Sequence, residues 1–101
     1  MIASNPDTFQ VSVKEVLTLQ FDFTNYLTAE TVTGGSATLT NKLTGSDASS
    51  AISNVSAASP NVSLKLTCTG LAANMDYLLI VAATKSNGDT EVMETVIKAV
   101  A

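Results

Sequence analysis

Residues 71–98 have the sequence LAANMDYLLIVAATKSNGDTEVMETVIK, in which two apolar segments are joined by a turn. Leu71 precedes Tyr77 by six positions, and a continuous apolar run extends from Tyr77 to Thr84. Asn87-Gly88 then favours the tight turn of a β-hairpin, and residues 91–98 are half apolar. The stretch therefore predicts the last two strands of a β-sandwich, the first of them central in its sheet and covered on both faces.

Further strands are predicted by alternating apolar and polar residues upstream. Residues 16–24 give the clearest case, because Leu17, Leu19, Phe21 and Phe23 would share one face. The same pattern predicts shorter strands over residues 9–13, 32–39, 51–55 and 62–68, with a bulge or short loop at Gly34-Gly35.

Short strands separated by frequent turn residues are typical of a sandwich with about seven strands. We therefore predict an all-β, immunoglobulin-like or fibronectin-III-like β-sandwich. Residues 1–101 would form a single domain, with residues 1–7 as a loose N-terminal arm. Tyr77 would pack inward and bond a backbone group near Leu71, as in the tyrosine corner of such folds.

The composition excludes several classes of partner. The chain is 46% hydrophobic and 14% charged, its net charge is −4, and it contains no Arg or His. Its five lysines form no basic run, so we expect no nucleic-acid partner. No window approaches about 20 apolar residues, so no membrane partner is expected. The N-terminus lacks the features of a secretory signal, and we expect Met1 to be a true start.

No set of residues with catalytic chemistry is recognisable. Without His there is no hydrolytic triad, and Cys68 alone can form neither a zinc site nor an internal disulfide. We therefore predict a non-enzymatic protein with no catalytic, cofactor-binding or metal-binding residues, in which Cys68 is a buried thiol. A calcium site formed by Asp47, Asp89 and Glu91 is the alternative to solvated turn residues, which we favour.

A possible interface follows from the double-sided apolar character of residues 77–84. Leu78, Ile80 and Ala82 would point away from the core, and Met93 and Ile97 would lie beside them. Exposed apolar patches usually mark interfaces, so these five residues are the predicted interaction surface. A loop folded across them is the alternative.

The register of the last hairpin stays open. A two-residue type I′ turn at Asn87-Gly88 would pair Thr84 with Glu91. A bulge would shift the pairing by one residue.

Residues 19–27 have the sequence LQFDFTNYL and are followed by AETV at 29–32. These segments are similar to the FDWSDWL segment and the GETI-like strand start of small immunoglobulin-like structural proteins of tailed bacteriophages, which the chain resembles. Phe23 and Tyr26 stand where tryptophans are usual, and the Arg that often follows the SNGD turn is absent. The resemblance extends over roughly residues 16–100.

This resemblance implies a virion component without catalytic residues. The expected role is a capsid decoration, head-fibre or connector subunit that assembles in the bacterial host cytoplasm. Its expected partners are the major capsid protein or a neighbouring head or tail component, together with further copies of itself. The alternative is a carbohydrate- or cell-surface-binding adhesin module that uses the loops at one end of the sandwich.

Overall fold

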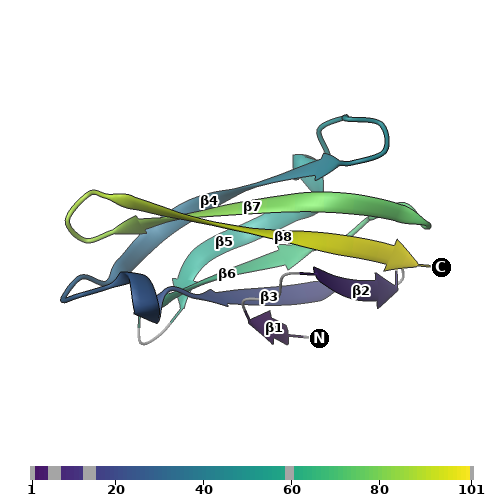
Figure 1. Cartoon of the computed structure of the whole chain (residues 1–101). Helices are drawn as coiled ribbons and strands as arrows, with labels where there is room; N and C mark the ends of the chain where they lie inside the picture. The colour runs from purple at the N-terminus through teal and green to yellow at the C-terminus, as the bar shows by residue number, and fades with distance from the viewer. Residues whose placement is uncertain (1, 5–7, 13–15, 59–60, 101) are drawn as a thin grey trace.

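The computed structural model describes residues 2–4, 8–12, 16–58 and 61–100, which form two four-stranded sheets packed face to face (Figure 1). The strands are β1 (Ile2–Ser4), β2 (Thr8–Ser12), β3 (Leu17–Asp22), β4 (Val32–Asn41), β5 (Ile52–Ala58), β6 (Ser63–Cys68), β7 (Met75–Lys85) and β8 (Thr90–Val100). Two 3-10 turns, η1 (Thr24–Tyr26) and η2 (Ser49–Ala51), lie in the connections. The predicted all-β sandwich is confirmed.

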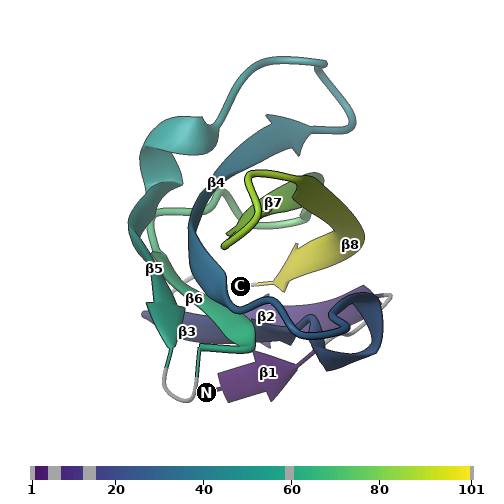
Figure 2. The same ribbon diagram turned by 90° about the vertical axis from the view of Figure 1, so that its left-hand side faces the viewer.

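The strand order is that of an immunoglobulin sandwich. One sheet has the order β1-β3-β6-β5 and the other β2-β8-β7-β4, which corresponds to the ABED and CFG sheets with β2 added beside the last strand. Three strands of each sheet are antiparallel, whereas β1 and β2 join their sheets as parallel edge strands. The view along the strands shows the two sheets as two layers, with β4, β7 and β8 in one and β5, β6 and β3 in the other (Figure 2).

The N-terminal segment differs from the prediction. Residues 2–4 pair with β3 as strand β1 and are therefore not part of a loose arm. Residues 1 and 5–7 of the predicted arm lie outside the described residues. A short parallel strand is not marked by a hairpin turn in the sequence, because its partner strand lies far along the chain. The sequence therefore did not predict β1.

The core forms where the inward faces of both sheets meet. Alternation along β3 and β6 places large apolar side chains on one face of each strand, and the same occurs on β7. The fully buried large residues include Leu19, Phe21, Phe23, Leu39, Leu64, Leu66, Leu79, Val81 and Ile97. At about 25 cal/mol per Å² of buried apolar surface, this cluster is the main source of stability.

Tyr77 forms the predicted tyrosine corner. Its side chain is buried, and its hydroxyl accepts a hydrogen bond from the backbone N–H of Ala72 at 2.9 Å. The contact ties the β6–β7 connection to the start of β7, next to buried Leu71. The prediction that the hydroxyl bonds the backbone near Leu71 is confirmed.

The last hairpin adopts the shifted register. The Gly88 N–H donates to the Lys85 carbonyl and the Lys85 N–H to the Asp89 carbonyl, at 2.9 and 2.8 Å. Gly88 has φ +92°, whereas Asn87 is not among the residues with positive φ. The connection is thus a type I turn closed by a glycine bulge, the second of the two alternatives left open by the sequence. Thr84 consequently pairs with Thr90 instead of Glu91.

The bulge predicted at Gly34-Gly35 is observed directly before these residues. The pairing of β4 with β7 shifts between Val32 and Gly34. A Cβ atom on Gly35 would lie 2.2 Å from the Ala82 carbonyl oxygen. Only glycine allows the two strands to approach this closely.

Candidate functional site

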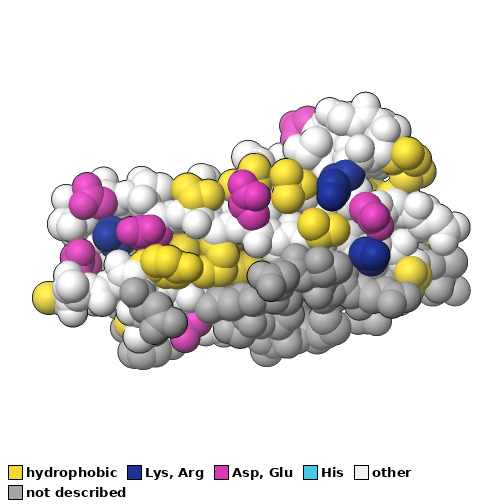
Figure 3. Space-filling view, in the orientation of Figure 1, with side chains coloured by type: hydrophobic (Ala, Val, Ile, Leu, Met, Phe, Trp, Pro, Cys, Tyr) yellow, Lys and Arg dark blue, Asp and Glu magenta, His cyan; other side chains and the backbone are white. Residues whose placement is uncertain are grey.

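The most distinctive surface of the molecule is the outer face of β7 and β8. Leu78, Ile80 and Ala82 alternate with the buried side chains of β7 and are half-buried on the side away from the core. In the observed register they lie beside Val92 and Val96 of β8. We call these five residues the apolar outer face. Figure 3 shows hydrophobic side chains exposed on this side of the molecule.

Only part of the predicted interface lies on this face. Leu78, Ile80 and Ala82 do, but Ile97 is 0% exposed in the core and Met93 is half-buried against it. The one-residue shift of the hairpin explains the difference, because a shift by one exchanges the two faces of a strand. Val92, which is 55% exposed, and Val96 take the places expected for Met93 and Ile97.

Two charged side chains interrupt the apolar outer face along β8. Glu94 is exposed, follows Val92 on the same side of the strand, and lies cross-strand from Ile80. Lys98 is exposed beyond Val96 and lies cross-strand from Asp76. The outward order on β8 is therefore apolar, acidic, apolar, basic.

The outer face of the other sheet is polar throughout its two central strands. β3 presents Thr18, Gln20 and Asp22, and β6 presents Lys65 and Thr67. The amide of Gln20 donates to the hydroxyl of buried Ser63 at 2.8 Å, so this surface satisfies its own polar groups. It offers no apolar area comparable to that on β7 and β8.

The free edge of β4 is partly covered by the following loop. The backbone N–H of Leu39 donates to the hydroxyl of Ser49 at 3.0 Å, and its carbonyl accepts from Ala48 at 2.7 Å. Asn41 likewise bonds Ser46 and Gly45 through its backbone. These bonds occupy groups that would otherwise be available to an added strand.

The edge strand β5 is irregular. Its pairing with β6 shifts between Ser53 and Ser56, and Asn54 within this shift has φ +56°. A bulge of this kind bends and twists an edge strand, which makes it a poor template for pairing.

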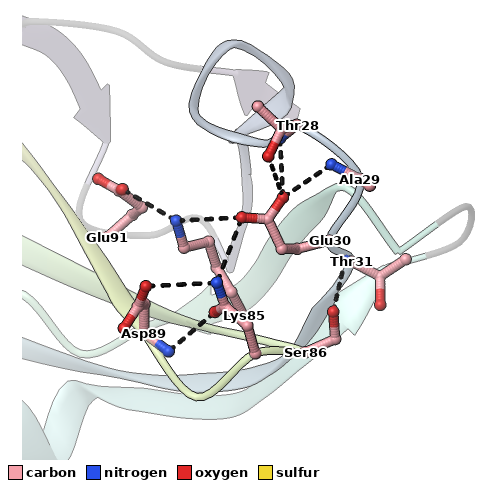
Figure 4. A network of polar contacts seen from close by, with 9 residues as sticks. Thr28, Ala29, Glu30, Thr31, Lys85, Ser86, Asp89 and Glu91 are labelled. Atoms are coloured by element: carbon pink, nitrogen blue, oxygen red, sulfur yellow. Dashed lines mark hydrogen bonds and ion pairs between the residues drawn. The ribbon is translucent and has the colours of Figure 1, made fainter.

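A polar network closes the end of the sandwich near the β7–β8 turn (Figure 4). Lys85 is 8% exposed, and its Nζ lies 3.7 Å from Glu30 Oε1 and 3.3 Å from Glu91 Oε1. Glu30 Oε2 accepts hydrogen bonds from the Thr28 hydroxyl and from the N–H groups of Thr28 and Ala29. The network joins the segment before β4 to the last hairpin.

The hydrogen bonds to Glu30 hold its carboxylate in the charged form. They lower the pKa of Glu30 to about 2, with the Thr28 hydroxyl as the largest cause and the neighbouring backbone N–H groups next. The Asn87 amide also donates to Glu30 Oε1, at 3.3 Å. With its charge stabilised and an ion pair to Lys85, Glu30 is best explained as a structural residue.

The described residues do not bring together the carboxylates of the possible calcium site. Asp47 bridges to Thr40 near the far end of β4, whereas Asp89 and Glu91 belong to the hairpin that pairs with the opposite end. In the described part of the chain, no three His, Cys, Asp or Glu residues are grouped closely enough to hold a metal ion. The calcium hypothesis is wrong for this set of residues.

Cys68 is an inert core residue. It is 0% exposed on the inner face of β6, and burial raises the pKa of its thiol to about 11. The reactive thiolate is therefore scarce at neutral pH. The prediction of a buried free thiol is confirmed.

A shallow hollow of about 300 Å³ lies at the end opposite the polar network, lined by Lys42, Leu43, Asn74 and Asp76. It is open to solvent, and Leu43 is 75% exposed.

Across the residues that the structure describes, there is no helix with the length and apolar character needed to cross a bilayer.

Comparison with protein-family models, with curated proteins and with solved structures gives no match for this chain.

Proposed function

We propose that this chain is a non-enzymatic structural protein of a tailed-phage virion. It would decorate or cement the capsid, or form part of a head fibre or connector, by binding other virion proteins. The observation that carries the proposal is the apolar outer face of β7 and β8, opposite a sheet whose outer face is polar. An apolar patch on one side of a small domain is typical of a protein that functions within an assembly.

Two features support binding through shape. The sandwich has a well-packed core and a closed hairpin end, so it can present a rigid surface at small conformational cost. The segments at 19–32 and 62–89 resemble phage structural proteins, which gives the proposed class of assembly.

The proposal is tested by expressing the tagged chain in bacteria that are producing tailed phage, and by purifying the phage particles on a density gradient. We expect the chain in the particle fraction, in a fixed ratio to the shell protein, and visible as added density by electron cryomicroscopy. A chain found only in the unbound fraction would contradict the proposal.

The matched variants are Ile80→Lys on the apolar outer face and Thr67→Lys on the polar face. Both exchange a half-buried outward residue for lysine. We expect Ile80→Lys to leave the particle fraction while remaining folded by circular dichroism, and Thr67→Lys to stay bound. Loss of binding by both variants, or by neither, would show that the apolar outer face is not the binding surface.

The adhesin alternative is supported by the hollow at Lys42, Leu43, Asn74 and Asp76, because it lies among loops at one end of the sandwich. A glycan array probed with the purified chain separates the two functions. Specific glycan binding that is lost in Asp76→Ala would favour the adhesin and count against the virion proposal.

A further inference from the structure

We propose that a second copy of this chain covers the apolar outer face, with β8 packed across β8 about a two-fold axis near Val96. This inference deepens the proposed function, on which it rests, by naming one partner of the same surface. In this arrangement Glu94 of each copy pairs with Lys98 of the other.

First, two edges of the sandwich, β4 and β5, are poorly suited to strand addition, which favours association through the apolar outer face. The β4 edge is occupied at Leu39 and Asn41 by bonds to its own loop, and β5 is bent at Asn54. Edge strands protected in these ways resist strand addition. The apolar outer face has no comparable protection, because Val92 is 55% exposed.

The second step is the spacing of charge on β8. Glu94, Val96 and Lys98 all point outward, so the two charges stand on either side of Val96, each about 7 Å away along the strand. Two-fold interfaces are self-complementary, with each contact made twice. A two-fold axis through Val96 and perpendicular to the strand places each Glu94 opposite the other copy's Lys98.

The third step is that Glu94 needs a positive partner if this face is buried. Its neighbours on the face are Val92, Val96 and the cross-strand Ile80, and an unpaired carboxylate buried among apolar groups is costly. Within the described part of the chain, neither Glu94 nor Lys98 takes part in an ion pair.

Other described lysines are less suitable partners for Glu94. Lys65 lies on the other sheet, and Lys85 is held by Glu30 and Glu91. Lys42 lies beside Asp76 at the loop end, where its backbone N–H donates to the Asp76 carbonyl at 2.8 Å. Lys98 of a second copy is therefore the cation that the two-fold arrangement brings to Glu94.

Sedimentation velocity of the purified chain over a range of concentrations tests the dimer. We expect a monomer–dimer equilibrium, with Val96→Lys raising the dimer Kd at least about tenfold. Thr67→Lys on the polar face should leave the Kd unchanged. Circular dichroism confirms that each variant folds. A wild-type chain that remains monomeric up to millimolar concentration would overturn the inference.

A charge exchange tests the pairing. Glu94→Lys or Lys98→Glu alone puts like charges together twice per dimer, so each should raise the Kd about tenfold or more. The double variant recreates the pairs with reversed sign and should return to within about threefold of wild type. If the binding free energy lost in the double variant equals the sum of the losses in the two single variants, the two-fold arrangement is overturned.

The two proposals fail separately. A monomeric chain that still bands with phage particles would end the dimer inference and leave the virion proposal standing. A dimer that never associates with particles would do the reverse.

Discussion

The two outer faces of this sandwich differ although the core beneath them is shared. β3 and β6 alternate strictly, with apolar residues inward and Thr, Gln, Lys and Asp outward. β7 is apolar on both sides, and β8 places valines outward while it places Thr95 inward. Folding requires only one apolar face for each sheet. The second apolar face on β7 and β8 therefore needs an explanation outside the fold, and association is the one we propose.

Substitutions at Leu79 and Ile80 test whether adjacent residues of β7 belong to different surfaces, and the first of them should have the strongest effect on stability. Leu79→Ala should lower the free energy of unfolding by about 2–5 kcal/mol, because Leu79 is fully buried. Ile80→Ser should lower it by about 1 kcal/mol or less, because Ile80 is half-buried on the outer side. Urea denaturation measures both.

Leu66→Ala on β6 is the control from the other sheet and should behave as Leu79→Ala does. If Ile80→Ser proves as costly as Leu79→Ala, Ile80 is a core residue and the contrast between the faces fails.

A second substitution tests how closely β4 is held against β7 in the sheet with the apolar outer face. Gly35→Ala would place a Cβ atom 2.2 Å from the Ala82 carbonyl oxygen, so the strands must separate. We expect a loss of about 1–3 kcal/mol in the free energy of unfolding, measured by thermal or urea denaturation.

Gly34→Ala is the matched control, because a Cβ atom on Gly34 would contact nothing within 4 Å. Equal effects of the two substitutions would mean that the close approach of β4 and β7 is not what requires glycine at position 35.

A smaller, stabilising effect is expected at Thr95, where β8 departs from the usual pattern. Thr95 is 2% exposed, and its hydroxyl has no hydrogen-bond partner among the described residues. Thr95→Val removes the unsatisfied group with little change of shape and should raise the free energy of unfolding by about 1 kcal/mol. Thr67→Val on the outer side of β6 is the control, and a destabilised Thr95→Val would show that the hydroxyl is satisfied in solution.

The smallest effect concerns the polar network at the end of the sheet that carries the apolar outer face. The pKa of Glu30 is lowered from 4.5 to about 2 by its hydrogen bonds, so the unfolded chain binds this proton more readily. The stability from Glu30 is therefore present above about pH 4.5 and is lost as the pH falls toward about 2. Urea denaturation across this range measures the loss.

Glu30→Gln should be less stable at neutral pH and lose less stability on acidification. Its pH profile should therefore be flatter than that of the wild-type chain between about pH 4.5 and about pH 2. An unchanged profile in Glu30→Gln would show that the hydrogen bonds from Thr28 and Ala29 do not hold the carboxylate in solution.

Local patterns predicted most of the fold. The alternation in residues 16–24, the apolar run that begins at Tyr77 and the tyrosine corner depend on neighbouring residues, and each is present in the structure. The hairpin register was not decided, because Asn87-Gly88 suits both a type I′ turn and a type I turn with a glycine bulge. That single residue of difference placed Met93 and Ile97 on the wrong face.

Contacts between distant residues could not be predicted. Glu30 and Lys85 lie 55 positions apart, and neither has a local pattern that marks its partner. The parallel strand β1 likewise has no local sequence signal, because residues 2–4 form a strand only through their pairing with β3. Side chains whose role depends on one strand's periodicity were thus predictable, whereas pairs joined by tertiary structure were not.

The parallel pairing of β2 with β8 has a mechanical consequence. Thr8 lies opposite Val96 and Ser12 opposite Val100, so tension between the N-terminal end of β2 and the C-terminal end of β8 pulls the two strands past one another along their length. The backbone bonds between them are then loaded together and must rupture almost simultaneously, whereas a hairpin pulled open from its free end would unzip one bond at a time. Under force the lifetime of the fold is governed by its unfolding rate, and this shear geometry opposes separation of β2 from β8 along their common direction.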